Sequence, residues 1–98
     1  MSWRTAARAD QQIEDLFEDG WRRFGEAQAT EYLDGLYDLF DLIVSQPRMN
    51  RLRDEFDPPV RIHPYRSHVV AYVEEENGVL IVAIKHARQD WQYRLGKR

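Results

Sequence analysis

Apolar residues recur every three or four positions through the first half of the chain and every second position near its end. The first period is typical of an amphipathic helix and the second of a strand. The pattern predicts helices over residues 6–24 and 26–45. Thr5 fits the N-cap of the first helix and Gly25 its C-cap, and Pro47 ends the second because the residue before proline avoids helical geometry. The apolar stripes comprise Ala6, Ala9, Ile13, Leu16, Phe17, Trp21 and Phe24 in the first helix, and Ala29, Leu33, Leu36, Phe40 and Ile43 in the second.

Two helices joined so briefly should form an antiparallel helical hairpin. The later period of two predicts strands near 60–65, 67–75 and 79–86, arranged as an antiparallel meander. Asn77-Gly78 separates the last two strands and suits a type I′ turn, because both residues tolerate positive φ. Residues 2–4 are expected to add an edge strand. The predicted fold class is therefore α+β, with the helical hairpin packed on a small antiparallel sheet.

The last predicted strand is apolar on both sides, although an antiparallel sheet with one wet face should alternate apolar and polar residues. One helical hairpin covers only one face, so the other face is available to a partner protein. The alternative is that loops and the C-terminal tail cover it. We predict that Leu80, Val82 and Ile84 face Ile13, Leu16, Leu36 and Phe40, and that Val79, Ile81 and Ala83 lie on the opposite face.

Length and charge narrow the class of protein. A chain of 98 residues with net charge −3 is expected to form a single domain over 1–98, and it contains no cysteine for disulfides or thiolate metal sites. It has no signal peptide and no apolar run that approaches a membrane span, so a cytoplasmic protein is expected, with no membrane association.

The charge is unevenly distributed. Residues 1–45 hold ten acids and four arginines, net −6, whereas residues 46–98 hold seven acids and ten basic residues, net +3. A net acidic chain is a poor match to nucleic acid, so no direct nucleic-acid binding is expected. The basic half suits an acidic partner, and a solvated surface explains the same asymmetry.

His86 is the main candidate for acid–base chemistry, because Arg88 and Asp90 follow it closely. The alternative, which we favour, is a structural histidine that hydrogen-bonds a neighbouring backbone group. His63 and His68 are predicted at the surface, and the three histidines lack the spacing of a zinc site. The chain contains no phosphate-binding loop or nucleophile elbow. We therefore expect a protein that is not an enzyme, with no catalytic residue, no cofactor and no metal.

Several short strings, taken in order, resemble the ParE toxins of the RelE/ParE toxin–antitoxin superfamily. Each string is degenerate, but their order and spacing over about residues 6–95 are fairly specific. Ala83, Lys85 and Gln11 depart from the residues usual in the family. The strings are Ala7-Arg8-Ala9-Asp10-Gln11-Gln12-Ile13, Phe24-Gly25, Pro47, Arg61, Ser67-His68-Val69-Val70-Ala71-Tyr72, Ile81-Val82-Ala83-Ile84-Lys85-His86 and Arg88-Gln89-Asp90.

The resemblance implies a plasmid-stabilisation toxin that inhibits DNA gyrase and is held inactive by a ParD-like antitoxin. The RelE-like branch instead cleaves messenger RNA on the ribosome, using an arginine on the middle strand and a histidine or tyrosine near the C-terminus. Here Val69 and Val70 stand where that arginine is expected, and only His86 remains of the set. The RelE-like activity and a non-toxic homodimeric module are the two alternatives.

Two binding surfaces are predicted. Aromatic residues mixed with arginine are typical of interface hot spots, so the C-terminal end is the candidate surface for the target, although Trp91 could instead close the core. The antitoxin is expected to fold on the apolar and basic side of the sheet. The predicted target-binding residues are Arg88, Trp91, Tyr93 and Arg94, and the predicted antitoxin-binding residues are Arg61, Val79, Ile81, Ala83, Lys85 and His86.

Overall fold

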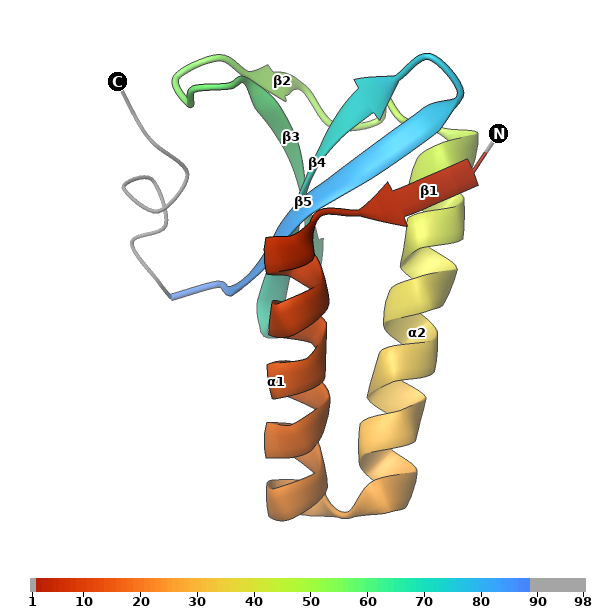
Figure 1. Cartoon of the computed structure of the whole chain (residues 1–98), viewed down its shortest axis with the longest axis vertical. Coiled ribbons are helices and arrows are strands. Elements are labelled where there is room, and N and C mark those ends of the chain that lie inside the picture. The colour runs from red at the N-terminus through yellow and green to blue at the C-terminus, as the bar shows by residue number, and fades with distance from the viewer. Residues whose placement is uncertain (1, 89–98) are drawn as a thin grey trace.

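A computed structural model describes residues 2–88 of the chain. Within this range two helices pack on one face of a five-stranded mixed sheet with strand order β1-β5-β4-β3-β2 (Figure 1). None of the helices is long and apolar enough to span a membrane in this described part of the chain. The elements are β1 (Ser2–Thr5), α1 (Ala7–Phe24), α2 (Glu26–Ser45), β2 (Leu52–Arg53), β3 (Val60–Tyr65), β4 (His68–Glu75) and β5 (Gly78–His86).

The predicted helical hairpin and the antiparallel meander β3-β4-β5 are confirmed. The expected edge strand exists, but β1 pairs with β5 in parallel, so the sheet is mixed and not purely antiparallel. Strand β2 was not predicted and pairs with β3 at the other edge. The predicted N-cap is wrong by one position, because Thr5 is the last residue of β1 and Ala6 precedes the helix. The Thr5 hydroxyl bonds the carboxylate of Asp10 instead.

The β4–β5 hairpin is confirmed, but its turn is not the predicted one. The turn residues are Glu76 and Asn77, and Gly78 already pairs with Glu75 as the first residue of β5. Gly78 has φ of 152°, and a Cβ there would collide with the backbone carbonyl of Ser2. The glycine is therefore needed because β1 approaches β5 closely.

An irregularity in β5 reverses part of the predicted side-chain orientation. Ala71 pairs with Ala83 and Tyr72 pairs with Ile81, so Val82 has no partner on β4. Such a bulge moves all side chains beyond it to the other face. Val79 and Ile81 consequently face the helices, and the prediction that they lie on the opposite face is wrong.

Beyond the bulge the predicted orientation holds. Ile84 faces the helices and Ala83 lies on the opposite face. Val82 packs on that opposite face too, against the prediction, and Leu80 belongs to neither of the two core clusters. A single extra residue thus separates the correct part of the prediction from the wrong part.

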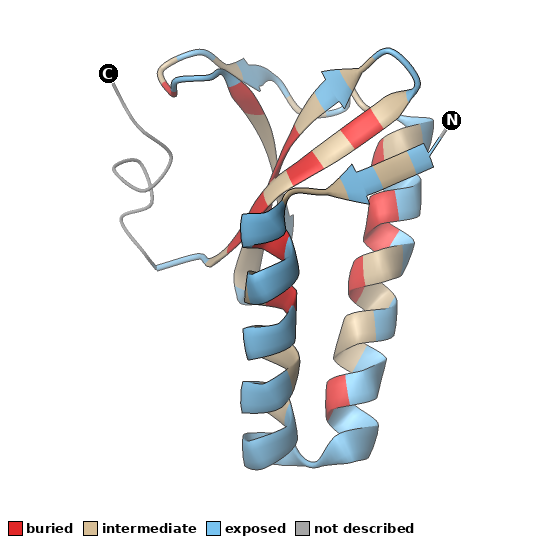
Figure 2. Cartoon of the chain, in the orientation of Figure 1, coloured by how far each residue is buried: buried red, intermediate tan, exposed pale blue. Residues whose placement is uncertain are grey.

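The larger of the two apolar clusters lies between the helices and the sheet, and Figure 2 shows its buried residues along the inner sides of the helices. Tyr72 is fully buried there, and its hydroxyl donates to the carbonyl of Pro47 at 2.8 Å while accepting from Asn50 at 3.1 Å. Trp3 stacks on Tyr37 with ring centroids 5.5 Å apart, which fixes β1 to α2. The larger cluster comprises Ala9, Ile13, Leu36, Leu39, Phe40, Ile43, Val70, Tyr72, Val79, Ile81 and Ile84.

The smaller cluster lies on the opposite face of the sheet. Phe56, from the segment between β2 and β3, covers Val60, Ala71 and Ala83 and is completely buried. A loop therefore covers part of this face. This agrees with the alternative prediction, in which loops cover the second face of the sheet.

Candidate functional site

The predicted target-binding residues begin where the described chain ends. Arg88 is exposed, and its backbone N–H donates to Nδ1 of His86 at 3.2 Å. Trp91, Tyr93 and Arg94 lie outside the described residues. The target-binding surface therefore stays a prediction.

Three of the predicted antitoxin-binding residues belong to the chain's own core. Val79, Ile81 and Ala83 expose 1%, 0% and 0% of their surface. Val79 and Ile81 are covered by the helices, and Ala83 lies in the cluster that Phe56 covers. The prediction that these side chains form an open surface is wrong, because a fully buried residue offers nothing for a partner to contact.

The polar members of that set keep accessible surface. Arg61 donates to the carbonyl of Asn50 at 2.6 Å and to Glu74 at 3.3 Å, which fixes its guanidinium at the sheet surface. Lys85 is partly exposed and His86 is exposed at the end of β5. Their role in antitoxin binding stays a prediction.

The opposite sheet face retains apolar surface beside Phe56. Three side chains pack against the smaller cluster but are only partly buried. They come from β3, β4 and β5, and all three lie on the side of the sheet that Phe56 covers. These residues, which we call the second-face patch, are Ile62, Val73 and Val82.

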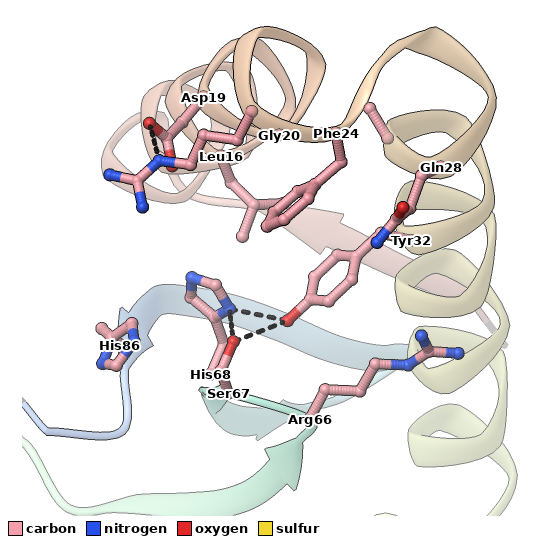
Figure 3. Close-up of a pocket in the computed structure, with 12 residues that line it drawn as sticks. Leu16, Asp19, Gly20, Phe24, Gln28, Tyr32, Arg66, Ser67, His68 and His86 are labelled. Carbon is pink, nitrogen blue, oxygen red and sulfur yellow. Dashed lines mark hydrogen bonds and ion pairs between the residues drawn. The ribbon is translucent and has the colours of Figure 1, made fainter.

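A pocket of about 540 Å³ lies between α1, α2, the β3–β4 turn and the end of β5 (Figure 3). Its volume is within the usual range for small-molecule sites. Its apolar part is formed by Leu16, Gly20, Phe24 and Ala29, and its polar part by Asp19, Arg23, Gln28, Tyr32, Arg66, Ser67, His68 and His86.

His68 is central to the polar part. Its Nδ1 lies 2.7 Å from the Tyr32 hydroxyl, and its ring meets that of His86 edge to face with centroids 5.4 Å apart. Burial lowers the pKa of His68, His86 lowers it further, and Asp19 opposes the change. The neutral form of the ring therefore predominates at pH 7, and its Nδ1 shares hydrogen bonds with the hydroxyls of Tyr32 and Ser67.

Arg66 is positioned by two tyrosines. It occupies the β3–β4 turn with φ of 54°, and its guanidinium lies 5.5 Å from the ring centre of Tyr32 and 5.6 Å from that of Tyr65. The Tyr65 hydroxyl donates to the carbonyl of Tyr32 at 2.7 Å, which ties the turn to α2. Arg66 forms no ion pair with any residue in the described range 2–88, so its charge is available to a ligand.

Sequence reasoning missed this pocket, since it placed His68 at the surface, read Tyr32 only as part of the apolar stripe of the second helix, and gave no role to Arg66. His68 is half-buried, and His63 is also partly buried, with Nδ1 3.0 Å from the Asn50 amide. Counting back from the turn along a regular hairpin pairs His68 with Lys85, whereas the bulge places it opposite His86. No local pattern in the sequence signals that bulge.

His68 and His86 do not form part of a metal site within the described residues. Within residues 2–88 no three side chains of His, Cys, Asp or Glu come together in a way that could hold a metal ion. What the arrangement offers chemically is a set of hydrogen-bonding side chains and two arginines, one of them paired with Asp19, beside apolar residues.

Comparison with known proteins agrees on one family. Residues 4–91 match the family model of the ParE toxin of the type II toxin–antitoxin system parDE. Toxin ParE1 from Mycobacterium tuberculosis strain CDC 1551 / Oshkosh is 31% identical over 83 residues, which cover 84% of this chain and 85% of the relative; the same figures hold for Toxin ParE1 from strain H37Rv.

A solved structure titled as the chromosomal ParDE TA system from P. aeruginosa has the same fold, with a TM-score of 0.74 at 12% identity. The match covers 88% of this chain and 95% of that one. On the match of the family model and on the curated relatives, this chain belongs to the ParE toxin family of type II toxin–antitoxin systems.

Proposed function

We propose that this chain inhibits DNA gyrase in the cytoplasm by binding it, and that a ParD-like antitoxin neutralises it. The observation that carries the proposal is membership of the ParE family over residues 4–91. Inhibition by binding requires an exposed recognition surface and no catalytic set.

The second-face patch supports the antitoxin part of the proposal. Ile62, Val73 and Val82 are partly exposed beside Phe56, on the face that the helices do not cover. Arg61 is the neighbour of Ile62 on β3 and pairs with Tyr72, so its side chain lies on the helix side of the sheet and is not part of the patch. A disordered antitoxin segment can fold onto such a face, with its apolar side chains on the patch.

The non-enzymatic part is supported by the chemistry of the middle strand. The sequence of β4, His68–Glu75, contains no arginine or lysine to stabilise a phosphodiester transition state. The exposed end of β5 leads through Arg88 into the aromatic and basic residues proposed to contact gyrase.

A supercoiling assay tests the target. The full-length chain should inhibit supercoiling by purified gyrase, and a variant without residues 88–98 should fold but inhibit far less. No inhibition by the full-length chain would remove gyrase as the target. Unchanged inhibition by the folded truncate would move the binding surface elsewhere.

The antitoxin is tested by size-exclusion chromatography with light scattering, using the purified chain alone and with the product of the adjacent reading frame. A tight hetero-oligomer is expected. A stable homodimer that ignores that product would favour the homodimeric interaction module.

One observation favours a second candidate, ribosome-dependent cleavage of messenger RNA. The edge-to-face pair of His68 and His86 could supply an acid and a base. Cleavage of ribosome-bound messenger RNA that His86→Ala abolishes would replace the gyrase proposal with this one.

A further inference from the structure

The helical hairpin extends farther than the sheet on which it packs. Its closed end, at the junction of α1 and α2, projects away from the strands (Figure 1). The buried residues of α1 are Ala9 and Ile13, both in the first half of the helix. The apolar stripe of α1 nevertheless continues from Ile13 for about three further turns, to Phe24. Much of the second half of the stripe is therefore left uncovered by the sheet.

Three aromatic residues in this second half form what we call the aromatic stripe, namely Phe17, Trp21 and Phe24. Spacings of four and three residues place them in one row along the helix. Phe17 and Trp21 meet edge to face with ring centroids 5.7 Å apart. Phe17 is partly buried, whereas Trp21 exposes 48% and Phe24 62% of its surface. Exposed aromatic rings that adjoin one another are typical of interaction sites.

Acidic side chains border the aromatic stripe. Glu14 and Glu18 each come three residues before an aromatic residue, so they are neighbours of Phe17 and Trp21 on the helix surface. Both glutamates are exposed, and neither forms an ion pair with any residue in the range 2–88. The whole hairpin, residues 7–45, holds ten acids and three arginines, net −7. The stripe thus combines an apolar surface with a negative border.

This combination selects the chemistry of the partner. A second copy of this chain would bring one acidic hairpin against another, and like charges repel. A helix with an apolar stripe beside lysines or arginines complements both the rings and the glutamates. Because side chains on a second helix recur at the same three- and four-residue spacing, they can pack along the row.

We propose that the aromatic stripe of α1 is a docking site for a basic amphipathic helix of a partner protein. The apolar stripe of that helix packs on Phe17, Trp21 and Phe24, and its lysines or arginines pair with Glu14 and Glu18. Trp21 is the central anchor, since it lies between the other two rings in the row. The site uses neither the second-face patch nor residues 88–98, so it does not depend on gyrase inhibition or on antitoxin binding.

Nuclear magnetic resonance titration of the full chain tests the site with synthetic peptides of about 14 residues, or four helical turns. The first peptide places leucines on one helical face and lysines on the other, the second has glutamate for every lysine, and the third has the composition of the first in an order without an apolar face. The first should shift the Trp21 indole signal and the amides of residues 14–24, and the others should bind at least about tenfold more weakly. Equal binding of either control peptide, or shifts confined to other residues, would overturn the proposal.

Trp21→Ala removes the anchor and should keep the helix, because the side chain is half exposed and alanine has the highest helix propensity. Affinity for the first peptide should fall about tenfold or more. Leu42→Ala removes an exposed apolar side chain of α2 outside the stripe and should leave affinity unchanged. Unchanged affinity in Trp21→Ala, with the circular dichroism of the wild type, would refute the site.

Glu18→Gln tests the acidic border, since glutamine keeps the size of the side chain and removes its charge. Affinity for the first peptide should fall about threefold, as expected for one exposed ion pair, and added salt should weaken binding to the wild type. Glu76→Gln is the matched control, because Glu76 is an exposed acid in the β4–β5 turn, far from the closed end of the hairpin (Figure 1). An equal loss in both variants, or binding that salt does not weaken, would contradict a basic partner.

Light scattering of the chain without peptide tests the second copy as the occupant. A monomer is expected from the repulsion between two acidic hairpins. A dimer that Trp21→Ala dissociates would assign the aromatic stripe to self-association and overturn the proposal.

Discussion

The two faces of the sheet are made by the same strands, yet they are covered in different ways. On the helix side, Val70, Tyr72 and Ile81 project into a cluster closed by two long helices. On the other side, Ala71 and Ala83 are the buried residues of the central strands, and a single loop residue, Phe56, covers them. The small side chains suit a thin cover, because a loop brings too few apolar atoms to fill the space around larger ones. The difference is that the thinly covered second face keeps partly exposed apolar side chains beside Phe56, which a partner can cover.

Among the substitutions that test this contrast, the largest loss of stability is expected on the helix side. Phe40 is fully buried, and it meets the ring of Trp3 at 5.0 Å and that of Tyr37 at 5.8 Å. Phe40→Ala should lower the free energy of unfolding by about 5 kcal/mol, because it leaves a cavity and removes both ring contacts. Phe56→Ala should cost about 3 kcal/mol, since the smaller cluster has fewer neighbours to lose. Urea unfolding of both variants measures this, and an equal or reversed order would contradict the contrast.

Two glycines, one in each helix, provide a second test of the packing on the helix side. A Cβ at Gly35 would collide with the Tyr65 hydroxyl, whereas a Cβ at Gly20 would make ordinary contact with Ala29 at 3.6 Å. Gly35→Ala should therefore lower unfolding free energy by about 2 kcal/mol through overpacking. Gly20→Ala, the matched control, should raise it by up to about 1 kcal/mol through helix propensity. Thermal unfolding compares them, and a neutral Gly35→Ala would show that Tyr65 is free to move.

Substitutions in the second-face patch are expected to change the affinity for the antitoxin more than they change stability. Ile62→Ala removes a partly buried side chain, so stability should fall by only about 1 kcal/mol. Affinity for the antitoxin should fall about tenfold if the side chain is an anchor of that interface. Calorimetric titration measures the affinity. Leu42→Ala, on an exposed position of α2, is the control and should change neither quantity much. Unaltered affinity in Ile62→Ala would move the antitoxin away from this face.

The smallest expected effect is on the way stability changes with pH. His86 and burial lower the pKa of His68 in the folded chain below 6.5, and Asp19, which is paired with Arg23, acts in the opposite direction. The unfolded chain therefore binds the proton more readily, so the contribution of His68 is fully present above pH 6.5 and is lost as pH falls toward the folded pKa. His68→Gln should flatten this part of the stability profile, measured by urea unfolding at several pH values. His63, whose pKa burial also lowers, should retain its own slope in that variant. An unchanged profile would place His68 in a solvated setting.

Much of the fold was predictable from local pattern. The stripe spacing and Pro47 located both helices, and Gly25 was correctly predicted as the junction between them, with φ of 90°. The three strands of the meander were predicted to within one residue at each end. These features depend on the order of neighbouring residues, which the sequence states directly.

The candidate pocket was not predictable in the same way. Tyr32, Arg66 and His68 are spread over α2, a turn and β4, and only the packing of the helices against the sheet end brings them together. The positive φ of Arg66 is unusual for a residue other than glycine, and no turn motif in the sequence predicts it.

By itself the sequence determined the elements, their order and the family, because helical and strand periods and family strings are local properties. Tertiary structure alone decided which side of β5 faces the helices. Every residue from Val79 to Ile84 is apolar, so the pattern fits either orientation. The bulge at Val82 sets Ile81 under the helices and His68 opposite His86. Since side chains alternate with a period of two, one unpaired residue is enough to reverse a face.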